Sequence, residues 1–202
     1  FKNKMVWHDD VELPKSDLVV LPGGFSYGDY LRCGSMASKS KIMQSVVNFA
    51  NSGGMVMGIC NGFQILVETG LLPGVLLRNK YLEFICRNVF VKINNKQNSY
   101  FKNIGNDILE FHIAHNEGNY FCTNDQLKEI EDNEQVAINY CDKEGKTEEK
   151  FNPNGSIKNI AGIFNKEKNV LGMMPHPERM IDPSLSGEDG SLFFNNLINN
   201  LK

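Results

Sequence analysis

One cysteine of the chain lies in a setting that favours nucleophilic chemistry. Cys60 stands in the sequence Gly-Ile-Cys-Asn-Gly, between Gly58 and Gly62, directly after the apolar run 55–59 and before a helix-like segment. This is the thiol counterpart of the serine nucleophile elbow. A residue at so sharp a turn is strained, and its neighbours two positions away must be small because strand and helix crowd together. The pattern predicts a thiol presented at the carboxyl end of a strand, where open α/β folds bind ligands.

The helix that is expected to follow Cys60 adds two effects. Its free N–H groups and the positive end of its dipole favour a thiolate. The N–H of Asn61 is also placed to stabilise an oxyanion. The alternative is a buried core cysteine beside two turn glycines, because cysteine is among the most buried residue types. We give that simpler interpretation to the other cysteines, which are Cys33, Cys86, Cys122 and Cys141.

A thiol nucleophile needs a base, and the segment Pro-His-Pro-Glu at 175–178 offers one. Pro177 forces His176 toward an extended backbone, in which residues i and i+2 point the same way. Glu178 can therefore orient the imidazole, which completes a set of nucleophile, base and orienting group. In isolation this segment also fits a surface turn with a solvated glutamate. We favour the triad because Cys60 and His176 both follow apolar runs that can pair in one sheet.

The elements that must position these residues predict an α/β fold. Segments 17–21 and 55–59 are short apolar strands, and segments 35–52 and 63–70 have helical spacing and end at glycines. Strand, helix, strand, helix at these lengths predicts a parallel sheet with helices on its faces.

The second half of the chain is richer in strand patterns. Strands are predicted over 84–93, 108–121, 133–141, 159–165 and 169–178, the last two as a strand pair joined by 166–168. A polar helix is predicted over 123–132 and a charged loop over 142–156. The last segment has helical spacing, with an apolar stripe of Leu192, Phe193, Leu197, Ile198 and Leu201. No repeat, linker or second domain is visible, so we interpret 1–202 as a single domain.

The composition argues against several classes of function. A net charge of -3 argues against a nucleic-acid interface, which needs clustered Lys and Arg. No apolar run approaches the roughly 20 residues of a membrane span. The five scattered cysteines form no C-x-x-C, which suits reduced thiols in the cytoplasm better than a disulfide framework or a metal site.

Together, the motifs resemble the class I, triad-type glutamine amidotransferases. The G-x-C-x-G motif is followed by Gln64, and a His-Pro-Glu lies downstream. Longer matches resemble the branch of this family that forms the glutaminase subunits of phosphoribosylformylglycinamidine (FGAM) synthase, at 22–34, 58–74, 78–87, 114–120 and 172–179. The resemblance covers nearly the whole chain. It implies a three-layer α/β/α open sheet of the flavodoxin-like kind.

The resemblance implies hydrolysis of glutamine to glutamate and ammonia. Cys60 would attack the carboxamide carbon and form a γ-glutamyl thioester, while His176 passes the thiol proton to the leaving amine and Glu178 holds His176. Water would then release glutamate.

The resemblance also implies the substrate-binding groups and the partners. The oxyanion would lie between the N–H of Asn61 and an N–H of the Gly23-Gly24 loop, with Gln64 framing the glutamine and His115 as a substrate or interface residue. Ammonia would pass to a large synthetase subunit, which converts formylglycinamide ribonucleotide to FGAM beside a small accessory subunit. That synthetase would bind ATP and Mg²⁺. No cofactor is expected in this chain, which has no G-x-x-x-x-G-K-[ST] and no G-x-G-x-x-G.

The sequence departs from the family pattern in two places. The loop His-Asn-Glu-Gly replaces the family's His-Gly-Glu-Gly, and Asn116 tolerates a left-handed backbone. The family also begins with a strand and a helix ahead of 17–21. We expect the chain to lack this β-α unit of about 30 residues, which leaves an unpaired sheet edge.

Two other functions compete with the glutaminase subunit. One is a stand-alone hydrolase such as a γ-glutamyl hydrolase, which would not need the loop "GGFSYGDYLRCG" at 23–34 as a contact with a synthetase. In that loop Arg32 is a candidate to pair with a carboxylate of the partner. The other is a non-catalytic binding subunit on the same scaffold. Glutamine-dependent thioester formation separates an enzyme from a scaffold, and stimulation by a synthetase separates a subunit from a hydrolase.

Overall fold

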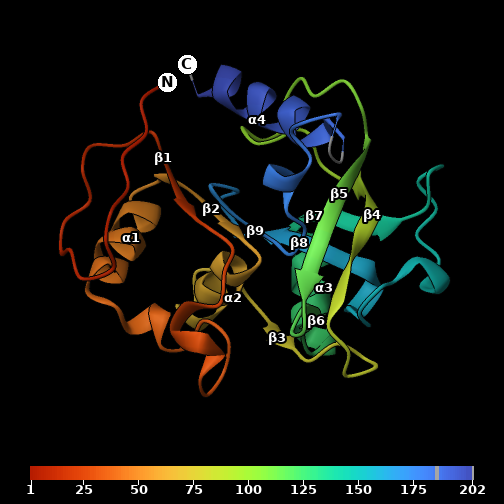
Figure 1. The fold of residues 1–202 in the computed structure, drawn as a ribbon, viewed down its shortest axis with the longest axis horizontal. Coiled ribbons are helices and arrows are strands. Elements are labelled where there is room, and N and C mark those ends of the chain that lie inside the picture. The colour runs from red at the N-terminus through yellow and green to blue at the C-terminus, as the bar shows by residue number, and fades with distance from the viewer. Residues whose placement is uncertain (185–186, 202) are drawn as a thin grey trace.

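A seven-stranded mixed sheet forms the centre of the computed structural model, which describes residues 1–184 and 187–201 (Figure 1). The strand order is β1-β2-β9-β8-β7-β4-β5. The strands of this sheet are β1 (Leu18–Leu21), β2 (Met55–Ile59), β4 (Ile85–Ile93), β5 (Ile108–His115), β7 (Val136–Cys141), β8 (Ile160–Phe164) and β9 (Val170–Met173). A separate antiparallel pair is formed by β3 (Val75–Leu77) and β6 (Asn119–Phe121).

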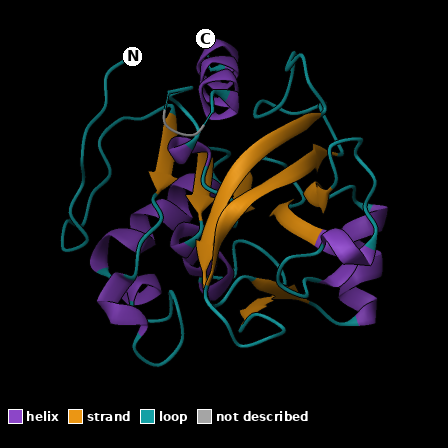
Figure 2. Cartoon of the chain, turned by 45° about the vertical axis from the view of Figure 1, so that its right-hand side comes forward, coloured by secondary structure: helices purple, strands orange, loops and turns teal. Residues whose placement is uncertain are grey.

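Four α-helices accompany the sheet within the described residues, and Figure 2 shows them around the strands. They are α1 (Lys41–Asn51), α2 (Asn61–Glu68), α3 (Asn124–Asp132) and α4 (Asp189–Asn200). Helix α2 packs against β1, β2 and β9, and α4 packs against β5. The α/β class that the sequence predicts is thus confirmed. Helix α2 packs against β2, the strand that ends directly before Cys60.

The parallel arrangement predicted from the first half of the chain is confirmed for β1 and β2, whereas most of the sheet is antiparallel. Strands β1, β2 and β9 are parallel to one another, whereas each neighbouring pair from β9 to β5 is antiparallel. Only five residues, 165–169, join β8 to β9, and a parallel pair needs a crossover of about a dozen or more. The second half of the chain therefore folds back on itself.

Several predicted boundaries shift for local reasons. The helix expected over 35–52 begins at Lys41, because Ser40 is extended (φ -64°, ψ 154°) after a 3₁₀ turn. The strand expected over 108–121 is divided into β5 and β6 by a turn. In α4 only Phe193 and Leu197 of the predicted stripe are buried, and Leu192 is exposed. The buried face of this helix is therefore narrower than predicted.

One apolar core runs through the described residues, between the sheet and its helices. Val56 and Met57 of β2 are fully buried, as expected for a central strand covered on both faces. The hydroxyl of Tyr100 donates to the carbonyl oxygens of Val56 and Asn169, at 2.7 and 2.8 Å. These bonds join the start of β2 to the start of β9, the two strands whose far ends carry the site.

The first sixteen residues form no helix or strand and run along α1 (Figure 1). The carbonyl of Val11 accepts a hydrogen bond from the Ser45 hydroxyl at 2.6 Å, and the carbonyl of His8 accepts one from the N–H of Ile42. Strand β1 begins one residue after the predicted start and is an edge strand within the described sheet. None of the helices described in the structure is long and apolar enough to cross a membrane.

Candidate active site

Cys60 occupies the strained turn that its sequence predicts. It lies between β2 and α2 with φ 50° and ψ -105°, a conformation that L-residues rarely adopt. Its N–H donates to the carbonyl oxygen of Met173 at 2.7 Å, and its own carbonyl accepts the N–H of Gln64 at 3.1 Å. The nucleophile elbow is therefore held from both sides, by strand β9 and by the first turn of α2.

The two glycines of the motif are required by close packing. A Cβ on Gly58 would lie 2.6 Å from the carbonyl carbon of Gly62. A Cβ on Gly62 would lie 2.0 Å from the carbonyl oxygen of Leu21 in β1. These approaches confirm the steric reason for glycine at both positions.

The substitution Gly62→Ala should destabilise the protein by about 3 kcal/mol, because the added methyl meets rigid backbone rather than a flexible side chain. Urea unfolding monitored by circular dichroism measures the change. The matched control is Gly105→Ala, whose Cβ would meet no atom within 4 Å. We expect that control to stay within about 0.5 kcal/mol of the parent. Equal stability of the two variants would contradict this description of the elbow.

Strands β2 and β9 bring Cys60 and His176 together, as the sequence predicts. They pair side by side, with Ile59 opposite Met173. The N–H of His176 donates to the carbonyl oxygen of His112 in β5 at 2.7 Å, which fixes the segment after β9 against that strand. A Cβ on Gly23 would lie 2.6 Å from the His176 ring and 3.6 Å from the Cys60 Cβ, so both side chains converge on Gly23.

Glu178 orients His176 in the predicted manner but through a different backbone. The Nδ1 of His176 lies 2.6 Å from Oε1 of Glu178. His176 has φ -105° and ψ 86°, and Glu178 lies in a 3₁₀ turn over Pro177–Arg179, so the segment is not fully extended. A carboxylate only accepts, so Nδ1 carries the proton and Nε2 is left as the basic nitrogen. That Nε2 is buried and has no hydrogen-bond partner among the described residues.

The ionisation of Cys60 differs from the expectation. Burial, with a smaller contribution from the negative charge of Glu178, raises the pKa of this thiol to about 12. The N–H of Asn61 lowers the pKa, but this effect of the helix N-terminus is smaller than that of burial. The free protein thus holds a neutral thiol, and attack requires that a base remove its proton.

This shift predicts how Cys60 reacts with a simple alkylating agent. The thiolate fraction should rise about tenfold per pH unit between pH 7 and 10, because these values lie below the pKa of about 12. Peptide mass spectrometry after timed exposure to iodoacetamide measures the rate at Cys60 alone. A rate that levels off below pH 9 would show that the thiol ionises more easily than its burial allows.

A cavity of about 220 Å³ opens beside Cys60. Its walls include Gly24, Cys60, Gln64, Arg78, His115 and Glu117. The volume is several times the roughly 30 Å³ of one water, and charges of both signs lie in the wall. This cavity suits a small zwitterion such as an amino acid.

Asn61 and Gln64 tie α2 to two loops of the cavity. The side-chain amide of Asn61 donates to Oε1 of Gln64 at 2.9 Å, and its oxygen accepts the N–H of Ser26 at 3.2 Å. The amide of Gln64 donates to the carbonyl oxygen of Glu117 at 2.7 Å. Gln64 therefore shapes the cavity wall by holding the loop after β5.

His115 is buried, and a residue that the sequence interpretation did not single out, Asn79, fixes its orientation. The amide nitrogen of Asn79 donates to the carbonyl oxygens of Glu83 and His115, so its oxygen faces Nδ1 of His115 at 3.0 Å. Nδ1 then carries the proton, and Nε2 is buried with no partner among the described residues. Burial, followed by the charge of His176, lowers the pKa of His115 to about 4. The ring is neutral at physiological pH.

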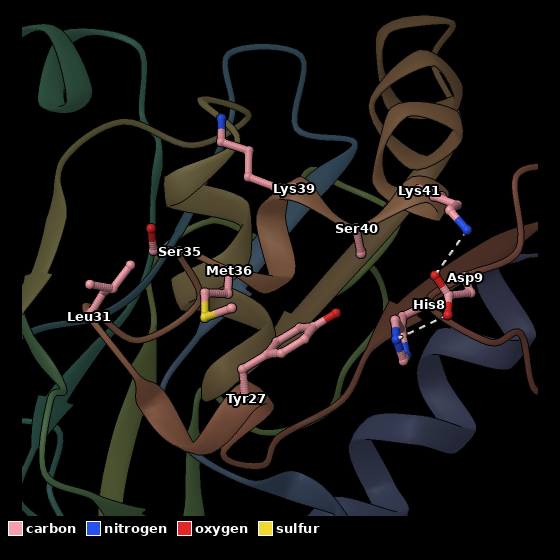
Figure 3. A pocket seen from close by; sticks show the side chains of 9 residues that line it. All are labelled: His8, Asp9, Tyr27, Leu31, Ser35, Met36, Lys39, Ser40 and Lys41. Atoms are coloured by element: carbon pink, nitrogen blue, oxygen red, sulfur yellow. Dashed lines mark ion pairs between the residues drawn. The ribbon is translucent and has the colours of Figure 1, made fainter.

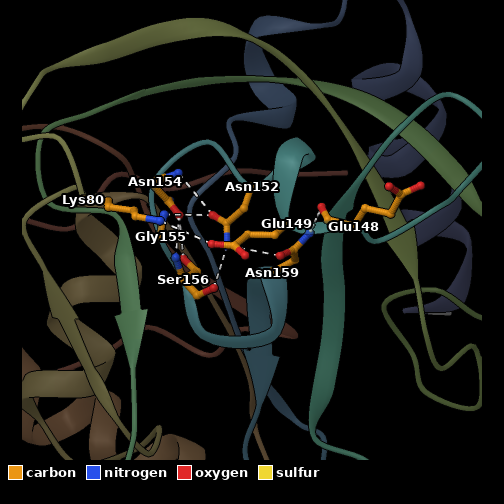
Figure 4. Close-up of polar contacts among 8 residues, drawn as sticks. All are labelled: Lys80, Glu148, Glu149, Asn152, Asn154, Gly155, Ser156 and Asn159. Carbon is orange, nitrogen blue, oxygen red and sulfur yellow. Dashed lines mark hydrogen bonds and ion pairs between the residues drawn. The ribbon is translucent and has the colours of Figure 1, made fainter.

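Asn154 and Ser156 belong to a polar network (Figure 4), and both contact the loop after β5. The side chains of Asn154 and Ser156 both donate to the carbonyl oxygen of Gly118, at 2.8 and 3.2 Å, and the N–H of Lys80 donates to the carbonyl oxygen of Asn154. A Cβ on Gly118 would lie 2.3 Å from the His115 ring. Asn116 does not have a positive φ, so this loop does not need the tolerance of asparagine for a left-handed backbone.

A larger cavity, of about 490 Å³, lies elsewhere (Figure 3). Its walls include His8, Tyr27, Leu31, Met36 and Lys41, and an ion pair between Asp9 and Lys41 at 3.3 Å lies at its rim. None of the predicted site residues lines this cavity, so its greater size does not make it the site of the thiol chemistry.

The remaining cysteines divide into two groups. Cys33, Cys122 and Cys141 are buried, as the sequence interpretation expects. Cys86 is exposed, which corrects its assignment to the core. It lies on β4 next to the edge strand β5, where one face of the sheet meets solvent. Within residues 1–184 and 187–201, no cluster of three or more His, Cys, Asp or Glu side chains could hold a metal ion.

The chain belongs to the family described as the CobB/CobQ-like glutamine amidotransferase domain, whose model matches residues 3–187. A relative in Pelagibacter ubique, phosphoribosylformylglycinamidine synthase subunit PurQ, is 81% identical over 202 residues, covering all of this chain and 89% of that protein. The protein of the same name in Synechocystis is 50% identical over 192 residues, covering 95% of this chain and 86% of that one. The solved structure of PurLQS from Thermotoga maritima contains a chain that is 39% identical, with a TM-score of 0.82. The match covers 96% of this chain and 84% of that one.

Proposed function

We propose that the chain is the glutaminase subunit of FGAM synthase in purine biosynthesis. The observation that carries the proposal is the 81% identity, over the whole chain, to a protein of that name. The elbow at Cys60 and the convergence of Cys60 and His176 on Gly23 support the chemistry that this function needs.

The proposed reaction uses Cys60, His176 and Glu178. As glutamine enters, Nε2 of His176 takes the thiol proton, and the sulfur attacks the carboxamide carbon. The tetrahedral oxyanion accepts hydrogen bonds from the N–H of Asn61 and an N–H of the Gly23-Gly24 loop. His176 then protonates the leaving ammonia, and water hydrolyses the γ-glutamyl thioester to glutamate. The 2.6 Å bond from His176 to Glu178 stabilises the imidazolium that forms in each step.

The cavity residues are proposed to bind the substrate. Gly24, Gln64 and His115 line the cavity beside Cys60, and Gly23 packs against both catalytic side chains. The absence of a side chain on Gly23 leaves room for the His176 ring, and Gln64 keeps the Glu117 loop against the substrate. No cofactor enters this mechanism in the chain itself.

An exposed apolar surface beside the cavity supports docking of a large synthetase subunit. Phe25, Tyr30 and Leu31 are 61, 69 and 78% exposed, and the ring of Phe25 lies 6.5 Å from that of Phe84, which is 52% exposed. Exposed aromatic patches of this kind mark protein interfaces. Arg32 pairs with Glu68 of α2 at 2.7 Å, and its side chain is 58% exposed, so it stays a candidate contact with the partner.

The proposed partners supply the rest of the reaction. The synthetase subunit binds ATP and Mg²⁺, receives the ammonia and converts formylglycinamide ribonucleotide to FGAM, with the small accessory subunit in the same complex. We place this complex in the cytoplasm.

Reconstitution with the synthetase and accessory subunits tests the proposal. The complete complex should form FGAM from glutamine or from ammonium salts. A complex that contains Cys60→Ala should keep only the ammonium reaction. Glutamine hydrolysis by the chain that does not respond to the synthetase, together with no FGAM from glutamine, would instead support a stand-alone hydrolase.

A further inference from the structure

A second thiol, on the opposite half of the sheet from β1, has a base within hydrogen-bond distance. Cys86 and Asn88 lie on β4 and His112 on β5, two strands that lie side by side (Figure 1). Asn88 is directly opposite His112 in the register, and Cys86 is opposite Ala114, so the thiol meets His112 diagonally. The distance from Sγ of Cys86 to Nε2 of His112 is 3.3 Å.

The hydrogen bonds around His112 define which nitrogen is the base. The amide nitrogen of Asn88 donates to Oε1 of Glu110 at 3.3 Å, which turns its oxygen toward Nδ1 of His112 at 2.9 Å. Nδ1 must then donate, so Nε2 presents its lone pair to the thiol of Cys86. A nucleophile, a base and a group that orients the base thus follow one another on the face of β4 and β5.

The charges around His112 keep that lone pair available. Burial lowers the pKa of His112, and the positive charges of Arg179 and His176 lower it further, while Glu178 acts in the other direction. The carboxylate of Glu110 lies on the same face and is linked to His112 through its hydrogen bond with Asn88. The imidazole is therefore neutral at physiological pH and can accept a proton from the thiol.

Cys86 is also the accessible thiol of the described chain. The other four cysteines are buried, Cys60 among them at 5% exposure. Cys86 does not line the cavity of the glutaminase site, so no enclosed pocket selects its reaction partner. An open thiol with its own base fits a small soluble reagent rather than a bound substrate.

We propose that Cys86 is a modification site for small disulfides, with His112 as its base and Asn88 as the residue that positions the base. Nε2 of His112 takes the thiol proton, and Sγ of Cys86 attacks one sulfur of the disulfide. The disulfide bond of the reagent breaks, a mixed disulfide forms on Cys86, and the second sulfur leaves as a thiolate that takes the proton from His112. The reaction is independent of glutamine hydrolysis.

The full chain carrying Cys60→Ser tests the proposal, with oxidised glutathione as the probe at pH 7. Peptide mass spectrometry should place the first mixed disulfide on Cys86. The substitution His112→Asn should slow that modification at least tenfold. The matched control is His8→Asn, the same change in a partly exposed histidine whose ring lies beside Asp9 rather than a thiol, and it should leave the rate within twofold.

A second variant guards against misfolding of His112→Asn. The substitution Asn88→Ala keeps the imidazole but removes the group that orients it, and it should slow the modification about threefold. Thermal melting confirms that each variant is folded. Absence of modification at Cys86, or a rate within twofold of the parent in both Asn88→Ala and folded His112→Asn, would overturn the proposal.

Discussion

Replacing Cys60 by alanine is expected to lower glutamine hydrolysis by at least about 10⁴-fold, the scale typical of removing a nucleophile that acts with its base as a unit. No other described cysteine can substitute. Cys60 alone stands at the elbow beside His176, and the strained backbone that presents it is specific to that turn. Glutamate release, measured on the complex with the synthetase, gives the rate.

The fold should survive the Cys60→Ala change, because alanine fills most of the space of a cysteine and keeps the hydrogen bond from residue 60 to Met173. Cys141→Ala is the matched control, since Cys141 is a buried cysteine at the end of β7 and outside the cavity lining. It should retain full activity. Retention of more than about a tenth of the glutaminase activity in Cys60→Ala would contradict the assignment of the nucleophile.

Removing the base should have the second-largest effect. We expect His176→Ala to lower the rate by about 10³- to 10⁴-fold, because general base catalysis contributes on this scale and the buried thiol, with a pKa of about 12, cannot ionise unaided. Single-turnover formation of the thioester isolates this step from ammonia transfer.

Glu178→Gln provides the graded comparison. Its carboxylate accepts from Nδ1 of His176 at 2.6 Å, but its side chain is 43% exposed, so water can partly replace it. We expect a loss of about 10- to 100-fold, smaller than that of His176→Ala. An effect of Glu178→Gln equal to that of His176→Ala would mean that the carboxylate does more than orient and stabilise the imidazole. Normal activity of His176→Ala would exclude His176 as the base.

The parts of the site that could be predicted from sequence are those set by local sterics. The elbow follows from Gly58 and Gly62, because a Cβ at these positions would lie 2.6 and 2.0 Å from backbone atoms. The meeting of Cys60 and His176 follows from two apolar strands that end at the same edge. Both inferences need only short segments and the rule that parallel strands align their carboxyl ends.

The parts that could not be predicted depend on packing between distant segments. The pKa of Cys60 is set by how deeply the surrounding chain buries it, and that burial outweighs the helix N-terminus. Asn79 orients His115 across 36 positions, with no motif to signal it. The pair of Cys86 and His112 depends on the register of β4 and β5, which strand alternation alone does not determine. The antiparallel half of the sheet likewise depends on loop connections rather than on strand patterns.

The residue that is modified by diazo-oxo-norleucine, a glutamine-mimicking electrophile, tests most directly whether Cys60 is the glutaminase nucleophile. Peptide mass spectrometry is done on the chain with and without the synthetase subunit. We expect modification at Cys60 alone, abolished in Cys60→Ala and accelerated by the synthetase. Modification at another residue, or none in the folded complex, would contradict a glutaminase built on Cys60 and His176.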